Sequence, residues 1–125
     1  MRILLTTIPH SQQRYPTVGD WIIARGHLAH IRVSEMGNED YAFLVAVHEL
    51  IEGWLCAKRG ITQEAVDAFD TAFEQRRVPG NTDEPGHDPE APYGREHRFA
   101  EKIERVLAEE LGVDWDAYDQ TVVEL

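Results

Sequence analysis

Cysteine is nearly absent from this chain. Cys56 is the only cysteine among 125 residues, so neither a disulfide framework nor a cysteine-rich zinc site can form within one chain. No apolar run approaches the length needed to cross a membrane, and the start of the chain is too short for a secretory signal. These absences predict a protein of the reducing cytoplasm that makes no membrane contact.

Basic residues are also scarce, and they are unevenly distributed. The formal net charge is −11. Residues 1–34 carry four arginines and one acidic residue, whereas residues 35–125 carry eight basic and 22 acidic residues. Direct binding to a nucleic-acid backbone requires a basic surface, so it is not expected. A protein that imitates nucleic acid, or one that attracts phosphates through metal ions, stays compatible with this charge.

The predicted elements come in the order strands first and helices afterwards, which is an α+β pattern. Residues 2–8, 20–24 and 28–33 read as strands, the last two joined as a hairpin around Arg25-Gly26-His27. Helices are predicted over 39–59, 62–77, 93–111 and 114–123 from apolar periodicity and capping residues. We therefore expect a small N-terminal antiparallel β-sheet of about three strands packed on a bundle of three to four helices.

A single domain is predicted over residues 1–125, with a sheet region at 1–37 and a helical region at 38–125. Residues 79–92 contain four prolines and two glycines, so this segment must be irregular. A loop of this length within a compact domain is often functional.

The first helical segment carries the strongest chemical signal. Around residues 42–47 it is apolar on all sides, which predicts a buried, central helix. On a helical wheel, one side forms an apolar stripe that is expected to face the core: Phe43, Leu44, Val47, Leu50, Ile51, Trp54 and Leu55. The other side carries small residues together with Glu49 and Glu52. Buried glutamates are costly unless they are paired, protonated or bound to metal.

Residues 48–52 read H-E-x-x-E. His48 and Glu52 lie one helical turn apart on the same side, with Glu49 beside them. A helix presents two metal ligands and a nearby base in this way. A buried polar network is the structural alternative, and the spacing leaves both open. Cys56, one turn beyond Glu52, is expected to be a small buried filler.

The third helical segment offers further ligands. We predict His97 as the third ligand, with Glu96 or Glu101 as alternates, and expect the long loop to bring in His87. A core stripe is expected on this helix as well: Phe99, Ala100, Ile103, Val106, Leu107 and Leu111.

Other acidic residues are assigned mainly to the surface. Glu101, Glu104 and Glu109 are expected to be solvated, because a glutamate-rich helix face is ordinary. The second helix carries an acidic stripe in which Asp70 is the expected exception to exposure.

The hairpin that leads into the apolar helix Val47-His48-Glu49-Leu50-Ile51-Glu52 resembles the active-site helix of the zincin metallopeptidases. The resemblance implies that His48 binds zinc and that Glu49 is the general base that activates water at the metal. Glu52 stands where that family has its second histidine, so a metal-dependent hydrolase is implied more directly than a peptidase. Mixed histidine and carboxylate ligands favour Zn²⁺, Mn²⁺ or Fe²⁺ over Mg²⁺.

A second resemblance covers nearly the whole chain. Residues 13–21, 33–38, 80–86 and 111–115 resemble small proteins of unknown function encoded by bacteriophages and prophages. This resemblance implies a host-cell cytoplasm and leaves the activity open. A non-enzymatic acidic protein that binds or inhibits a host protein is therefore one alternative function.

A further alternative is an enzyme similar to the all-α nucleotide pyrophosphohydrolases. That family binds magnesium through E-x-x-E on one helix and E-x-x-D on the next, a spacing that Glu49, Glu52, Glu64 and Asp67 reproduce loosely. The N-terminal strands, which that family lacks, and His48, which it does not need, favour the zincin-like hypothesis.

Overall fold

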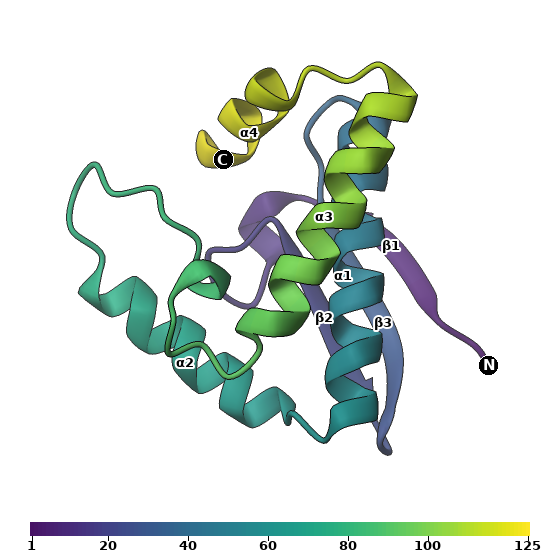
Figure 1. The fold of residues 1–125 in the computed structure, drawn as a ribbon, viewed down its shortest axis with the longest axis vertical. Coiled ribbons are helices and arrows are strands. Elements are labelled where there is room, and N and C mark those ends of the chain that lie inside the picture. The colour runs from purple at the N-terminus through teal and green to yellow at the C-terminus, as the bar shows by residue number, and fades with distance from the viewer.

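The computed structural model describes residues 1–125 and has an α+β fold, as predicted (Figure 1). A three-stranded sheet is followed by four helices: β1 (Leu4–Ile8), β2 (Gly19–Ala24), β3 (His27–Ser34), α1 (Glu39–Arg59), α2 (Gln63–Arg76), α3 (Gly94–Leu111) and α4 (Trp115–Val123). The irregular segment before α3 contains one short 3₁₀ turn, Pro85–His87. None of the helices combines the length and the apolar character that crossing a membrane requires.

The sheet has the strand order β1-β3-β2 and is mixed. β2 and β3 form the predicted hairpin, in which Arg25 and Gly26 both take positive φ angles, as a two-residue hairpin turn requires. β1 runs parallel to β3, with Leu4 opposite His30 and Ile8 opposite Ser34. The prediction of an antiparallel sheet is therefore wrong for β1. The long loop after β1 allows this strand to reach the outer edge of the hairpin in either direction, and residue patterns do not encode which.

Helix α1 is the central element, packed on β2 and β3 on one side and on α3 on another (Figure 1). Its first turn is capped by Asn38, whose side chain accepts a hydrogen bond from the Tyr41 backbone N–H. Gly53 allows the sheet to approach closely, because a Cβ at this position would lie 2.9 Å from Cγ of Trp21. α1 thus positions its residues between the sheet and α3.

The buried side of α1 matches the predicted apolar stripe only in part. Leu44 of that stripe is fully buried, but Phe43, Leu50 and Trp54 are 50%, 37% and 45% exposed. The other buried residues of α1 are small or polar: Val45, Ala46, His48, Glu52, Gly53 and Cys56. The small residues permit close approach of the sheet, and the polar ones meet polar partners from α3. Tertiary contacts, rather than the width of the apolar stripe, decide which side is buried.

Helix α3 also matches its predicted core stripe only in part. Ala100 of that stripe is fully buried, but Phe99, Ile103 and Val106 are exposed. The polar residues Glu96, His97 and Glu104 are buried. The expectation that Glu104 is solvated is therefore wrong. Glu104 is buried because it bonds two partners inside the molecule, as described below.

Arg14 ties the loop after β1 to two other elements. Its guanidinium forms two hydrogen bonds to Asp20 on β2, of 2.8 Å and 2.9 Å, and it also contacts Asp67 on α2. This pairing holds α2 against the sheet, beside a cleft that is lined by residues of α2, the irregular loop, α3 and α4.

Candidate metal centre

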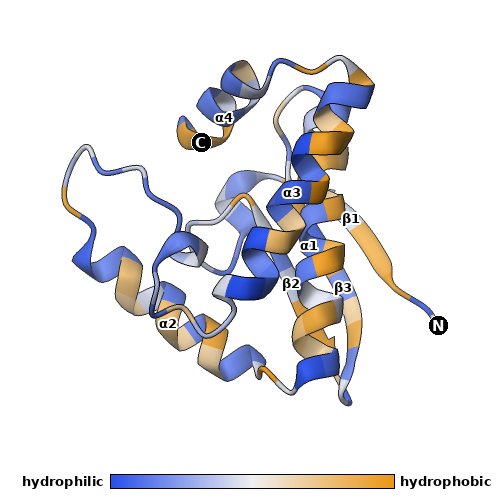
Figure 2. Cartoon of the chain, in the orientation of Figure 1, coloured by the Kyte–Doolittle hydropathy of each residue, from blue (hydrophilic) through white to orange (hydrophobic).

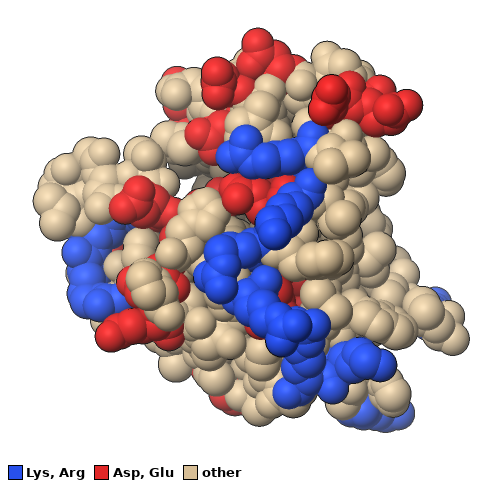
Figure 3. All heavy atoms as spheres, viewed as in Figure 1, with Lys and Arg blue, Asp and Glu red and all other residues tan.

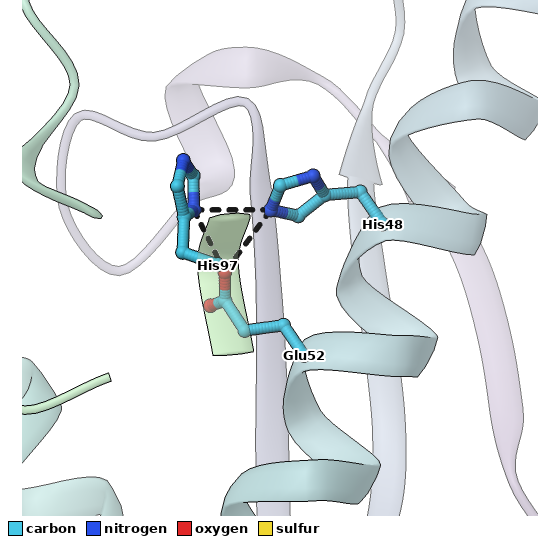
Figure 4. Close-up of side chains that lie close together, drawn as sticks. All are labelled: His48, Glu52 and His97. Atoms are coloured by element: carbon cyan, nitrogen blue, oxygen red, sulfur yellow. Dashed lines mark hydrogen bonds and ion pairs between the residues drawn. The ribbon is translucent and has the colours of Figure 1, made fainter. Parts of the chain in front are cut away.

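Three side-chain atoms from α1 and α3 converge on one point at the base of the cleft (Figure 4). Nε2 of His48 lies 3.0 Å from Oε2 of Glu52 and 3.1 Å from Nδ1 of His97. The third edge of the triangle, from Nδ1 of His97 to Oε2 of Glu52, is 2.9 Å. All three residues are buried, with exposed fractions between 5% and 7%. The structure therefore brings the three predicted ligands together.

Each of these residues is held at its opposite side by a further protein group. Nδ1 of His48 donates to Oε1 of Glu104 at 2.7 Å, and Nε2 of His97 donates to Oε2 of Glu84 at 2.9 Å. Oε1 of Glu52 accepts a hydrogen bond of 2.9 Å from the indole N–H of Trp21. Because a carboxylate only accepts hydrogen bonds, these contacts place protons on the outer ring nitrogens. The inward nitrogens of neutral histidines then carry lone pairs.

Three lone pairs that face one another at about 3 Å repel unless a cation lies among them. One such cation is a proton, and the hydrogen-bond pattern shows how protons respond. Burial alone lowers the pKa of His97, yet its hydrogen bonds to Glu52 and Glu84 raise that pKa to about 9. Burial alone would lower the pKa of His48 as well. Its hydrogen bonds to Glu104 and Glu52 outweigh burial and raise that pKa well above its ordinary value. Despite burial, the pKa of Glu52 is held far below its usual value by both histidines.

The other cation that fits is a divalent metal. Donor atoms bound to zinc at about 2.0–2.1 Å are roughly 2.8–3.0 Å apart in an octahedral arrangement and roughly 3.3–3.4 Å apart in a tetrahedral one. The observed edges of 2.9–3.1 Å lie within this span. Two imidazoles and one carboxylate are a donor set of catalytic zinc sites, and the carboxylate held behind each histidine is typical of metal-binding imidazoles. The residues present therefore fit a metal.

Glu49 lies beside this triangle and makes no hydrogen bond or ion pair of its own. Its side chain lies against the backbone of β2, because a Cβ at Gly19 would be 2.7 Å from Cγ of Glu49. Burial, reinforced by the charge of Glu52, raises the pKa of Glu49 well above its ordinary value. An unpaired carboxyl group with a raised pKa that lines the cleft is suited to take up a proton near neutral pH.

The cleft above the triangle has a volume of about 590 Å³, which is within the range of small-molecule sites. Its lining is rich in acidic side chains. Asp70 is one of them, a buried carboxylate that accepts hydrogen bonds from Tyr15 and Tyr93 and contacts no cation. Burial raises the pKa of Asp70 to about 6, although both tyrosines stabilise its charged form. The expectation that Asp70 is not exposed is confirmed.

The remaining predicted ligands lie outside the triangle. Glu96 is buried but forms an ion pair with Arg59 at the end of α1. His87 lies 3.3 Å from Glu101 and 3.9 Å from Glu84, so these three residues form a separate group at the mouth of the cleft. His97 touches this outer group through Nε2.

The four carboxylates of the magnesium alternative do not form one group. Glu64 is exposed at the start of α2, and Asp67 is paired with Arg14. Neither belongs to a group of histidine and carboxylate atoms with metal-binding spacing.

The sequence did not identify the residues that hydrogen-bond to the outer atoms of His48, Glu52 and His97. Glu84, Trp21 and Glu104 come from a loop, a strand and a distant helix turn, and Glu104 is itself held by the hydroxyl of Tyr118 at 2.6 Å. A close approach of the loop to His97 was also missed. Gly86 lies so near the imidazole that a Cβ would be 2.3 Å from Cγ of His97. The only sequence signal was Gly86 itself, one of two glycines in a loop that also contains four prolines.

Comparisons of this chain with protein-family models, with curated proteins and with solved structures each gave no match.

Proposed function

We propose that this protein is a divalent-metal-dependent hydrolase whose metal is held by His48, Glu52 and His97. The observation that carries the proposal is that each of the three residues directs one side-chain atom to a common point and bonds another protein group through a second atom. Their inward atoms converge within 3.1 Å of one another, and their outward atoms are bonded to Glu104, Trp21 and Glu84. With protons on both inward nitrogens these atoms form a hydrogen-bonded network with Glu52; with those protons removed, the same three atoms are free to bind one metal ion.

The residues around the metal position divide the chemistry between them. A divalent metal supplies a Lewis acid that polarises the bond to be cut and lowers the pKa of water. Glu49 takes the proton from the attacking water, because it is unpaired, lines the cleft and has a raised pKa. Glu104 and Glu84 fix the orientation and the proton position of the two imidazoles.

Zinc is the metal we propose first, with manganese and iron as alternatives, because two histidines and one carboxylate suit these ions better than magnesium. The zincin-like hypothesis for the strand hairpin and the H-E-x-x-E helix supports the same assignment. The acidic lining of the cleft favours neutral or cationic substrates over phosphorylated ones, since Asp70 and its neighbours would repel a phosphate.

The direct test is metal stoichiometry. Purified protein is stripped with a chelator, dialysed against zinc, manganese or iron(II), and analysed by elemental analysis together with thermal unfolding. We expect one metal per chain and a raised unfolding temperature, with both effects lost in His48→Ala and His97→Ala.

His27→Ala is the matched control, because His27 is an exposed histidine of the β2–β3 hairpin and belongs to neither group of atoms with metal-binding spacing. It should retain the full metal content. A protein that binds no metal, or whose binding survives His97→Ala, contradicts the proposal. Hydrolysis of a panel of neutral, cationic and phosphorylated esters and peptides by the loaded protein then defines the substrate class.

A further inference from the structure

A large apolar surface lies on the outer side of α1 and α3. Six large side chains are exposed there by 37% to 67%: Phe43, Leu50, Trp54, Phe99, Ile103 and Val106. Figure 2 shows the hydrophobic residues of α1 and α3 on the side of the molecule near β1, away from α2. We call these six residues the outer apolar surface. Monomeric proteins rarely leave a continuous apolar area of this kind uncovered.

The two helices present this surface as one unit because they pack side by side in opposite directions. His48 bonds Glu104 near the middle of both helices, while Arg59 at the end of α1 bonds Glu96 at the start of α3. Leu50 and Trp54 belong to one side of α1, and Phe99, Ile103 and Val106 follow one another at helical spacing along α3.

The charges on α3 are ordered along the helix. The exposed basic residues Arg95, Arg98, Lys102 and Arg105 occupy its first three turns, where Glu96 and Glu104 are buried and Glu101 is partly buried, whereas the exposed Glu109 and Glu110 lie at its end. Figure 3 shows the basic side chains as a band over this part of the molecule, beside an uncharged area. Arg95 and Glu110 lie on the same side of the helix as the exposed apolar residues, and both are exposed. Neither takes part in an ion pair within the chain.

The exposed residues of α3 can pair with the same residues of a second copy of α3 that runs in the opposite direction. If two copies of α3 lie antiparallel about a twofold axis between Lys102 and Ile103, Phe99 of each copy meets Val106 of the other. In the same register Arg95 meets Glu110. An interface in which residue i contacts residue j, and j contacts i, is the signature of a twofold dimer.

We propose that the outer apolar surface is the interface of a homodimer in which α3 packs antiparallel on α3 of a second copy. Leu50 and Trp54 of α1 extend the apolar contact at the flank of the α3 pair, and two Arg95–Glu110 pairs close its ends. The cleft opens on the side of α2 and the loop, so both clefts of the dimer stay accessible. The dimer does not depend on the proposed metal site.

Analytical ultracentrifugation of the full-length protein over a wide concentration range tests the proposal. We expect a reversible dimer that Ile103→Glu converts to a monomer, because two carboxylates would be buried next to each other at the axis. Val78→Glu is the control, since Val78 is a large exposed apolar residue, 64% exposed, outside the interface. It should leave the dimer intact.

A charge exchange tests the register. Arg95→Glu and Glu110→Arg should each weaken the dimer about tenfold, because each places like charges together twice per dimer. The double variant should recover most of the loss. A wild-type protein that stays monomeric, a dimer that survives Ile103→Glu, or a double variant that shows no recovery overturns the proposal, and a monomer captured by a different protein would assign the surface to that partner. Unchanged circular dichroism establishes that each variant is folded.

Discussion

Nε2 of His48 on α1 lies 3.1 Å from Nδ1 of His97 on α3, although 49 residues separate them in the chain. The pair meets at the carboxylate of Glu52, which lies one helical turn from His48. Two corners of the triangle are therefore set by the local geometry of one helix, and the third is set by the packing of α3 on α1.

Glu49→Gln should abolish hydrolysis and leave metal binding intact. The amide keeps the size of the side chain but cannot accept a proton, and loss of a general base lowers rates by about 10²–10⁴-fold. The measurement is hydrolysis of p-nitrophenyl acetate by the metal-loaded protein, with metal content determined in parallel. Glu109→Gln on the exposed face of α3 is the control. Full activity in Glu49→Gln would remove the assigned role.

Glu104→Gln should weaken metal binding without removing a ligand. Glu104 accepts the proton of His48 Nδ1 at 2.7 Å, and loss of such a partner typically costs about 10–100-fold in metal affinity. Competition titration with a chromogenic zinc chelator measures the change. Tyr118→Phe removes one bond to Glu104 and should have a smaller effect in the same direction. Equal affinities in all three proteins would show that Glu104 does not orient His48.

Gly86→Ala should displace His97. A Cβ at this position would lie within 2.3–2.7 Å of three atoms of the imidazole, and contacts below about 3 Å force a shift of the loop or the ring. We expect lower metal affinity and a lower unfolding temperature. Thr82→Ala, an exposed substitution in the same loop, is the control. A crystal structure or a histidine NMR spectrum with an unmoved His97 ring would contradict this expectation.

The metal-free protein should lose stability as the pH rises from about 6.5 through about 9. The pKa of His97 is raised to about 9 from 6.5, so its contribution is fully present below the lower value and disappears above the higher one. The loss is on the order of 3 kcal/mol, and His48 acts in the same direction. Urea unfolding with a chelator at several pH values measures it.

Zinc should reverse this trend, because the histidines must lose protons to bind it, so zinc-dependent stabilisation should grow with pH. The variant His97→Gln should show a smaller pH dependence without metal. The exposed His27→Gln should behave as the wild type. A pH-independent stability of the metal-free wild type would mean that the histidines carry no shared proton.

The sequence predicted the elements well because their signals are local. The bounds of α1 follow from Asn38, which caps the helix, and from Gly60, which ends it with a φ of 71°. The Arg25-Gly26 turn likewise identified the hairpin. The direction of β1 has no local signal, since it depends on how a ten-residue loop crosses the sheet.

The three ligands of the candidate site were predictable from the sequence, but the residues that hydrogen-bond to those ligands were not. The i, i+4 spacing identifies His48 and Glu52, and His97 was the most natural third ligand on the helix expected to face them. Glu104 was expected in solvent because a glutamate on a charged helix is usually exposed. Its burial follows from two partners, His48 and Tyr118, that lie on other helices. Trp54 is exposed for a related reason, because the side of α1 that carries His48 and Glu52 is needed inside, and only part of the apolar stripe, such as Leu44, is buried as well.

Because Glu104 is held by Tyr118 on α4, its hydrogen-bond partners become available at different times during synthesis of the chain. The ribosome delivers His48 and Glu52 first, His97 49 residues after His48, and Tyr118 only with α4. Until then Glu104 lacks one of its two partners. In the proposed metal site, the support of His48 through Glu104 is therefore complete only after α4 has been made.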